Sequence, residues 1–175
     1  KFELLSFSSE NCIGNEGLIL EFGVFTGQTL TYIANLYSES IIYGFDSFQG
    51  LTEVWKGAEI GNFALKTLPT VSKNSELIIG YFQDVLLKFL EKHTELALFI
   101  HIDCDLYSST KYVLETLYLQ KRLLNTIIQF DEIHGHEDAE KHELKAWLEF
   151  VQKYSIKYKY LGHVPSSEQA TLQLI

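Results

Sequence analysis

Residues 18–46 read LILEFGVFTGQTLTYIANLYSESIIYGFD and hold the pattern from which the fold is predicted. Two short apolar runs, 18–23 and 41–46, have the β-branched and aromatic content of strands that are buried on both faces. Between them, residues 28–37 have the apolar spacing of a helix. A strand, a helix and a second strand in this order form the repeating unit of a parallel sheet covered by helices.

The middle of the chain repeats this alternation. Three more buried strands are predicted, at 76–80, 96–102 and 125–130, and helices are predicted at 84–93 and 137–154. Another helix is expected to begin at Ser108, with Ser109 and Thr110 as alternative caps. The Gly-rich and polar stretch 47–75 is too long for a plain connector, which is typical of a functional loop or a small lid.

The end of the chain follows a different pattern. Residues 157–163 and 170–175 are predicted strands, and the VPSSEQ segment between them is too short for a helical crossover. They are therefore expected to form an antiparallel hairpin at the edge of the sheet. The chain as a whole predicts one α/β domain, 1–175, with a doubly wound, mostly parallel seven-stranded sheet.

Charge and composition exclude several classes of partner. The 175 residues carry a formal net charge of −9 and have a pI near 5.1, so nucleic acid is not an expected partner. No apolar run reaches the roughly 20 residues that cross a bilayer, and the first residues lack the layout of a signal peptide, so no membrane is expected. Cys12 and Cys104 are far apart and are predicted to be free thiols, which indicates a cytoplasmic protein.

The turn after the first strand indicates a ligand site, because open parallel sheets bind ligands outside the carboxyl ends of their strands. Gly23 and Gly27 allow the backbone to approach a ligand, but Phe25 replaces the second glycine of a dinucleotide fingerprint. Asp46 ends the second strand, 23 residues after Gly23, where its carboxylate can accept hydrogen bonds from both hydroxyls of a ribose. This spacing favours a cofactor that contains adenosine.

Other residues near these strand ends leave alternatives open. Glu21 is a carboxylate inside an apolar strand, so it needs a cation, either the α-amino group of a cofactor or an internal lysine. Three aromatic residues follow strand ends and either stack on a purine or belong to the core: Phe48, Trp55 and Phe82.

Four carboxylates follow the fourth and fifth strands. Asp103 and Asp105 follow one strand, and Asp131 and Glu132 follow the next. If the two strands are adjacent and parallel, they lie about 4.8 Å apart, and the crowded carboxylates repel one another unless a cation is present. Oxygen ligands favour Mg²⁺, Mn²⁺ or Ca²⁺, so a divalent metal is expected. The alternative is that these acids cap helices or face solvent.

Five segments of the chain form a specific set when taken in order: LEFGVFTGQT (20–29), GFDSFQGLTEVW (44–55), GYFQDVL (80–86), HIDCDLYSST (101–110) and FDE (130–132). Together they resemble the macrocin O-methyltransferase family, the metal-dependent sugar O-methyltransferases of macrolide and aminocoumarin biosynthesis. The resemblance runs from about residue 18 to residue 150. It implies a Rossmann-like class I methyltransferase that uses S-adenosylmethionine to methylate a hydroxyl of a small molecule, such as a sugar or glycoside.

The resemblance also implies roles for single residues. Asp46 looks like the ribose ligand, and Asp105 looks like the general base that takes the proton of the acceptor hydroxyl. The implied cofactor-binding residues are Glu21, Gly23, Gly27, Thr29, Asp46, Ser47, Phe48, Phe82 and Asp103. The implied ligands of Mg²⁺ or another divalent cation are Asp103, Asp131 and Glu132.

The sequence departs from the family at two points. Glu132 stands where the family has an Asp, and its longer side chain has a different reach. The family's enzymes have N-terminal helices that close over the acceptor, whereas 17 residues precede the first predicted strand here. The acceptor site is then either more open or completed by a second subunit of a homo-oligomer.

Three other functions remain as alternatives. Asp103 and Asp105 also fit the DxD motif of a metal-dependent glycosyltransferase. That function would not explain why Gly23 and Asp46 also follow strand ends at the spacing of a cofactor site. A non-catalytic subunit that binds S-adenosylmethionine is the second alternative. An NAD-dependent oxidoreductase is the third, and Phe25 and the terminal hairpin weaken it.

Overall fold

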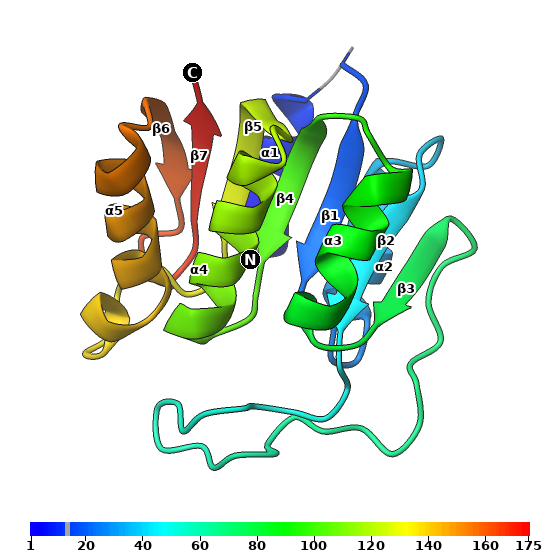
Figure 1. Ribbon diagram of the computed structural model, residues 1–175, viewed down its shortest axis with the longest axis vertical. Coiled ribbons are helices and arrows are strands. Elements are labelled where there is room, and N and C mark those ends of the chain that lie inside the picture. The colour runs from blue at the N-terminus through cyan, green and yellow to red at the C-terminus, as the bar shows by residue number, and fades with distance from the viewer. Residues whose placement is uncertain (13–14) are drawn as a thin grey trace.

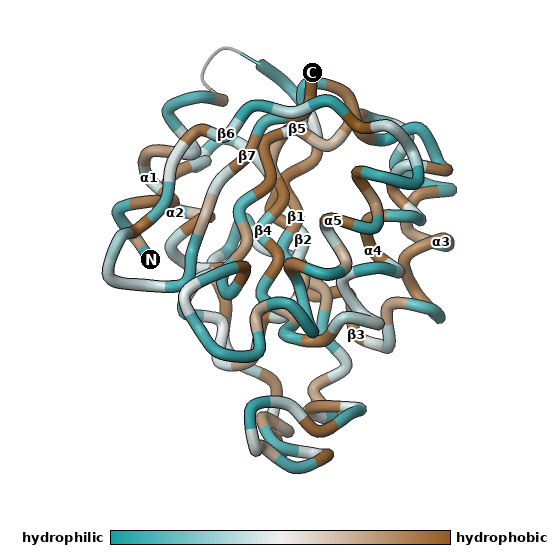
Figure 2. Tube along the Cα trace, turned by 90° about the vertical axis from the view of Figure 1, so that its left-hand side faces the viewer, coloured by the Kyte–Doolittle hydropathy of each residue, from teal (hydrophilic) through white to brown (hydrophobic). Residues whose placement is uncertain are grey.

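The computed structural model describes residues 1–12 and 15–175. In chain order, its elements are α1 (Phe2–Glu10), β1 (Leu18–Phe22), α2 (Gln28–Leu36), β2 (Ile42–Asp46), β3 (Ser75–Ile79), α3 (Phe82–Lys92), β4 (Ala97–Ile102), α4 (Tyr107–Leu119), β5 (Leu123–Phe130), η1 (Ala139–Lys141), α5 (Glu143–Tyr154), β6 (Tyr158–His163) and β7 (Ala170–Leu174). The strands form one sheet with helices on both faces (Figure 1). α3, α4 and α5 cover one face, and α1 and α2 cover the other, as the edge-on view of Figure 2 also shows.

The strand order is β3-β2-β1-β4-β5-β7-β6. β1 to β5 are parallel, and β7 pairs antiparallel with both β5 and β6. The prediction of a doubly wound, mostly parallel seven-stranded sheet with a C-terminal antiparallel hairpin is therefore confirmed. The order reverses between β1 and β4, because the chain moves outward from β1 to β3 and then returns to the other side of β1. Open α/β sheets bind ligands at such a reversal.

The central strand β1 is buried on both faces, and its side chains alternate between two hydrophobic clusters. Leu18, Leu20 and Phe22 belong to the cluster under α3, α4 and α5. Ile19 belongs to the cluster under α1 and α2. Full burial of such a side chain stabilises the fold by roughly 1.5–3 kcal/mol. The apolar run in the sequence therefore specifies a central strand.

Three local features differ from the sequence-based expectation. α1 lies in a segment for which no element was predicted. α4 begins at Tyr107 after Leu106, so the predicted caps Ser108, Ser109 and Thr110 are wrong. Leu106, the residue before α4, is buried against Leu51 and Trp55 of the loop after β2, and this packing places the start of the helix. The N-terminus of α4 has no hydrogen bond from a capping side chain.

The predicted helix 137–154 is also interrupted. It divides into η1 and α5, and His142 between them has neither a helical nor a β backbone conformation (φ −119°, ψ −121°). Directly after this break, the buried carboxylate of Glu143 accepts a hydrogen bond from the backbone N–H of Glu132, with 3.2 Å between the donor and acceptor atoms. The polar contact and the break together turn α5 onto the sheet.

Cys12 is a buried free thiol and Cys104 a partly buried one, as predicted. Within the part of the chain that the structure describes, every helix is too short or too polar to cross a membrane.

Candidate functional site

A cavity of about 490 Å³ lies at the carboxyl ends of β1, β2 and β4, where the strand order reverses. Its walls also include the loop after β2, the start of α3 and the side chain of Lys1. The predicted site residues that line it are Gly23, Thr29, Asp46, Ser47, Phe82, Asp103, Asp105 and Glu132. Trp55, one of the aromatic candidates, lines it as well, together with Tyr81 and Gln83, which were not predicted. A second cavity lies at the opposite edge of the sheet and contains none of the predicted site residues.

Gly23 is required where β1 ends against β4. Its φ is +94°, and a Cβ atom there would lie 1.8 Å from the carbonyl oxygen of Asp103. The hydrogen at this position lets the two strand ends approach each other at the edge of the cavity. Gly27, with φ +77°, directly precedes α2 and is not part of the cavity wall. A Cβ atom there would lie 3.2 Å from Cγ1 of Val71.

The Asp46 carboxylate holds the turn after β1. Its Oδ2 accepts hydrogen bonds from the backbone N–H groups of Val24 (2.9 Å) and Phe25 (2.8 Å), and its Oδ1 accepts one from Phe48 (2.7 Å). A carboxylate offers about four acceptor positions, so about one is left for a ligand. The contact of Asp46 with ribose hydroxyls stays a prediction, and the backbone N–H groups leave about one acceptor position for it.

Four predicted site residues do not line the cavity: Glu21, Gly27, Phe48 and Asp131. The side chain of Phe48 belongs to the core cluster under α1 and α2, so the structure gives it a packing role. Phe82 lies on the cavity wall and packs edge-on against Phe22, which fixes its ring.

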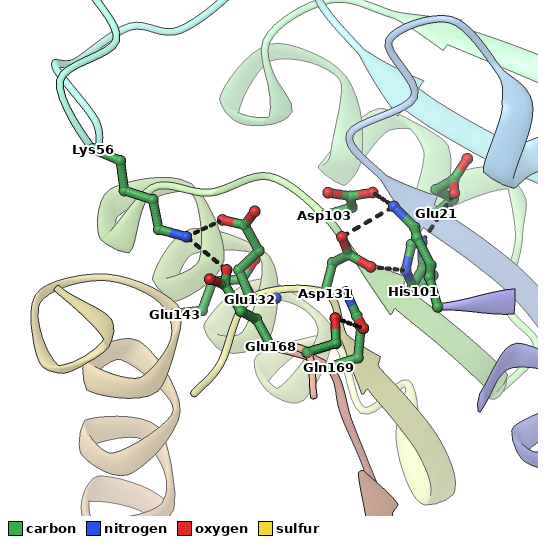
Figure 3. Close-up of polar contacts among 11 residues, drawn as sticks. Glu21, Lys56, His101, Asp103, Asp131, Glu132, Glu143, Glu168 and Gln169 are labelled. Atoms are coloured by element: carbon green, nitrogen blue, oxygen red, sulfur yellow. Dashed lines mark hydrogen bonds and ion pairs between the residues drawn. The ribbon is translucent and has the colours of Figure 1, made fainter. Parts of the chain in front are cut away.

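Glu21 is fully buried and pairs with a histidine that was not predicted. Its Oε1 lies 2.9 Å from Nδ1 of His101, which is also fully buried (Figure 3). The partner of Glu21 in this structure is therefore His101 and not an internal lysine, and a contact with the α-amino group of a cofactor stays a prediction. Burial by itself lowers the pKa of His101, but the contacts with Asp131 and Glu21 outweigh burial and raise the pKa to about 10. Burial raises the pKa of Glu21.

Asp103 and Asp131 come together, as expected from adjacent parallel strands. The ammonium group of Lys1 lies between them, with Nζ 2.6 Å from Asp103 Oδ2 and 3.0 Å from Asp131 Oδ2. Burial by itself lowers the pKa of Lys1, but the two carboxylates outweigh it and raise the pKa above its ordinary value. His101 lies on the other side of Asp131, with 3.6 Å between His101 Nε2 and Asp131 Oδ1 (Figure 3).

Glu132 lies apart from Asp103 and Asp131, although all three were predicted to bind the same metal ion. Its Oε2 lies 3.3 Å from Nζ of Lys56, and the same ammonium group lies 2.6 Å from Glu168 Oε2. Figure 3 shows the two groups side by side, one around Asp131 and one around Lys56. Among the described residues, the side chains that come close enough to share a metal ion are His101, Asp103 and Asp131.

These side chains do not fit a divalent cation in the arrangement seen. Lys1 holds one oxygen of each carboxylate, and Glu132 is engaged by Lys56. The raised pKa of His101 keeps its imidazole protonated at neutral pH, and a protonated imidazole has no lone pair for a metal.

Asp105 lines the cavity directly after β4. Burial, with the nearby charges of Asp103 and Glu132, raises the pKa of its carboxyl group to about 8. A carboxyl group with this pKa exchanges its proton near neutral pH and is suited to general acid–base chemistry.

Comparisons with known proteins agree with this geometry at the level of the fold. No family model matches the chain, and no curated protein is significantly similar to it. Among solved structures, the calicheamicin methyltransferase CalS11 has a TM-score of 0.79 and 23% identity, with 98% of this chain and 77% of that chain covered. The apo form of CalS11 is described as a TDP-rhamnose 3'-O-methyltransferase and has a TM-score of 0.70 and 22% identity, with the same coverage.

Two further structures contain cofactor ligands. The O-methyltransferase from Bacillus cereus in complex with SAH has a TM-score of 0.62 and 16% identity, covering 99% of this chain and 80% of that chain. The Mg–SAM structure of cmcI has a TM-score of 0.64 and 12% identity, covering 99% of this chain and 71% of that chain. This chain therefore has the fold of these methyltransferases.

Proposed function

We propose that the protein is an S-adenosylmethionine-dependent O-methyltransferase that acts on a hydroxyl group of a small molecule. The observation that carries this proposal is that one cavity contains two sets of groups. Gly23, Asp46 and Phe82 line it at the ends of β1, β2 and β3, where an adenosine cofactor would lie. Asp103 and Asp105 line it at the end of β4, where an acceptor would meet the methyl group.

In the proposed reaction, the acceptor hydroxyl lies between Asp105 and the methyl group of the sulfonium. Asp105 takes the hydroxyl proton, the oxygen forms a bond to the methyl carbon, and the bond from that carbon to sulfur breaks. S-adenosylhomocysteine then leaves as a neutral thioether. The cavity wall and the loop after β2 would limit the access of water to the sulfonium.

The finer expectation of a sugar acceptor remains part of this proposal, whereas the expected metal does not, because Lys1 holds the Asp103–Asp131 pair. A sugar or glycoside acceptor is supported by the rhamnose substrate in the description of CalS11, together with the family resemblance. A divalent cation such as Mg²⁺ would polarise acceptor oxygens when bound. Because Lys1 occupies the Asp103–Asp131 pair, the proposed steps use only protein groups.

Two alternatives are weaker. In a DxD glycosyltransferase, Asp103 and Asp105 would share a metal with a diphosphate, whereas the Asp103 carboxylate here is bound to Lys1. An NAD-dependent enzyme needs close approach of a pyrophosphate to the turn after β1, and Phe25 lies in that turn with a φ of +48°.

Calorimetric titration with S-adenosylmethionine tests the proposal. We expect one site with micromolar affinity in EDTA, and no binding of NADH. Asp46→Asn should weaken the binding of S-adenosylmethionine at least about tenfold, because a charged hydrogen bond contributes roughly 1.5–3 kcal/mol. Asp138→Asn is the matched control, since Asp138 pairs with Lys141 on the surface.

Absence of binding by the unmodified protein would overturn the proposal. Methyl transfer would then be measured with radiolabelled cofactor and a panel of sugars and glycosides. Tight binding without transfer to any acceptor would favour the non-catalytic subunit.

A further inference from the structure

The Asp103–Asp131 pair already has a cation. The Lys1 ammonium group donates hydrogen bonds to both carboxylates, over 2.6 Å to Asp103 and 3.0 Å to Asp131. The side chains of Lys1 and Asp103 are 28% and 23% exposed, and that of Asp131 is 10% exposed. Water therefore screens these contacts less than it screens an ion pair on the surface.

Helix α1 holds Lys1 in this position. Lys1 is the residue directly before the helix, and its carbonyl accepts a hydrogen bond from the N–H of Leu5. The helix is anchored by buried Leu4 and Leu5 and by Ser8, whose hydroxyl lies 2.9 Å from Gln129 Oε1 on the sheet. The packing of α1 on the sheet therefore fixes the position of the Lys1 ammonium group.

Lys1 and a divalent ion cannot hold the same carboxylate oxygens together. Mg²⁺ binds oxygen at about 2.0–2.1 Å, so an ion between the two Oδ2 atoms would displace the ammonium group from its place. A third carboxylate would favour a divalent ion over a single positive charge. Among the described residues none comes close enough to share an ion with this pair, and Glu132 pairs with Lys56 instead.

We propose that Lys1 is the resident cation of the Asp103–Asp131 pair and takes the place of a divalent metal ion. An ammonium group has three N–H donors, and two are used by the carboxylates. Lys1 also lines the cavity, so the third N–H is available to an acceptor oxygen. The catalytic consequence, methyl transfer without a metal, rests on the proposed function. The exclusion of the metal by Lys1 does not depend on it.

Binding of Mn²⁺, measured by electron paramagnetic resonance, tests this proposal. We compare the unmodified protein with Lys1→Ala, Lys1→Arg and the matched control Lys153→Ala, each with the same start methionine. Lys153 pairs with Glu115 on the outer surface, so its loss changes the net charge equally. We expect Lys1→Ala to bind one Mn²⁺ at least tenfold more tightly than the other three proteins.

The thermal stability of the same proteins gives an independent readout. Lys1→Ala leaves two carboxylates without their cation, so we expect a lower Tm in EDTA and a higher Tm in Mg²⁺ for this variant alone. If the variant is unfolded in EDTA, Mg²⁺ is expected to restore its folded circular-dichroism spectrum.

Two results would overturn the proposal. One is equally tight Mn²⁺ binding by the unmodified protein, which means that Lys1 does not exclude the ion. The other is a Lys1→Ala protein that neither binds Mn²⁺ nor responds to Mg²⁺. Titration with S-adenosylmethionine in the same samples distinguishes either result from a failure of the proposed function, because cofactor binding is measured separately.

Discussion

Asp105 combines an unusual backbone conformation with an unusual pKa. Its φ is +63°, in the left-handed region that Asp and Asn tolerate better than most residues. Burial and the charge of Asp103 raise the pKa of its carboxyl group to about 8, and Lys56 opposes the shift. The residue is therefore half ionised near the pH at which a general base is most useful.

Asp105→Asn keeps the size and the backbone preference of the residue but removes the base. We expect methyl transfer to fall by roughly 100-fold or more, with unchanged affinity for S-adenosylmethionine. In the unmodified protein, kcat/KM should rise with pH through about 8, because the base acts only when it has lost its proton. The variant should lose this rise.

The matched control is Asp138→Asn, at a surface residue, which should show the same profile as the unmodified protein. Near-normal turnover of Asp105→Asn, with the rise intact, would remove Asp105 from the role of base.

At the scale of elements, α1 covers a polar row that crosses four strands of the sheet. The strand registers align Glu21 with His101, His101 with Gln129, and Gln129 with Thr171. All four residues are buried. The Ser8 hydroxyl lies 2.9 Å from both Gln129 Oε1 and Thr171 Oγ1. A helix that packs on this row must therefore supply polar groups to it.

Ser8→Ala should destabilise the protein because it leaves buried polar groups on Gln129 and Thr171 without their partner. We expect the free energy of unfolding to fall by about 1–3 kcal/mol, measured by urea denaturation. Ser9→Ala is the control in the same helix, since the Ser9 hydroxyl donates a hydrogen bond to the carbonyl of Ser6 within that helix. Equal effects of the two substitutions would mean that the row does not depend on α1.

At the scale of the whole molecule, the loop between β2 and β3 runs along the carboxyl edge of the sheet (Figure 1). Lys56 connects it to Glu132 after β5 and to Glu168 before β7. Leu51 and Trp55 pack against Leu106 at the start of α4. The loop is thus fastened to elements on the far side of the cavity.

Lys56→Gln should loosen this loop without unfolding the sheet. We expect faster cleavage within the loop in limited proteolysis and an increase of about two- to fivefold in the Kd of S-adenosylmethionine, as for the loss of a partly exposed ion pair. Added salt should reduce the difference between the two proteins. Lys153→Gln, on the outer surface, should change neither quantity. Unchanged proteolysis of Lys56→Gln would show that the ion pairs do not hold the loop.

The order of apolar and polar residues along the chain was enough to predict the sheet and much of the cavity wall. The apolar runs gave the strands because β1 and β4 must be buried on both faces. Gly23, Asp46, Asp103 and Asp105 were predicted to meet at one edge because parallel strands end on the same side of a sheet. The cofactor and the acceptor are still proposals, since the fold alone does not identify a ligand.

Which charged side chains pair with one another could not be predicted, because the pairs form between segments that are far apart in the sequence. The pairing of Glu21 with His101 depends on the register between β1 and β4, which alternating hydrophobicity does not encode for polar residues. Lys1 meets Asp103 across 102 positions of sequence because α1 packs on the sheet. Glu132 follows Asp131 directly, but successive side chains at a strand end point in different directions, so the two acids have different lysine partners.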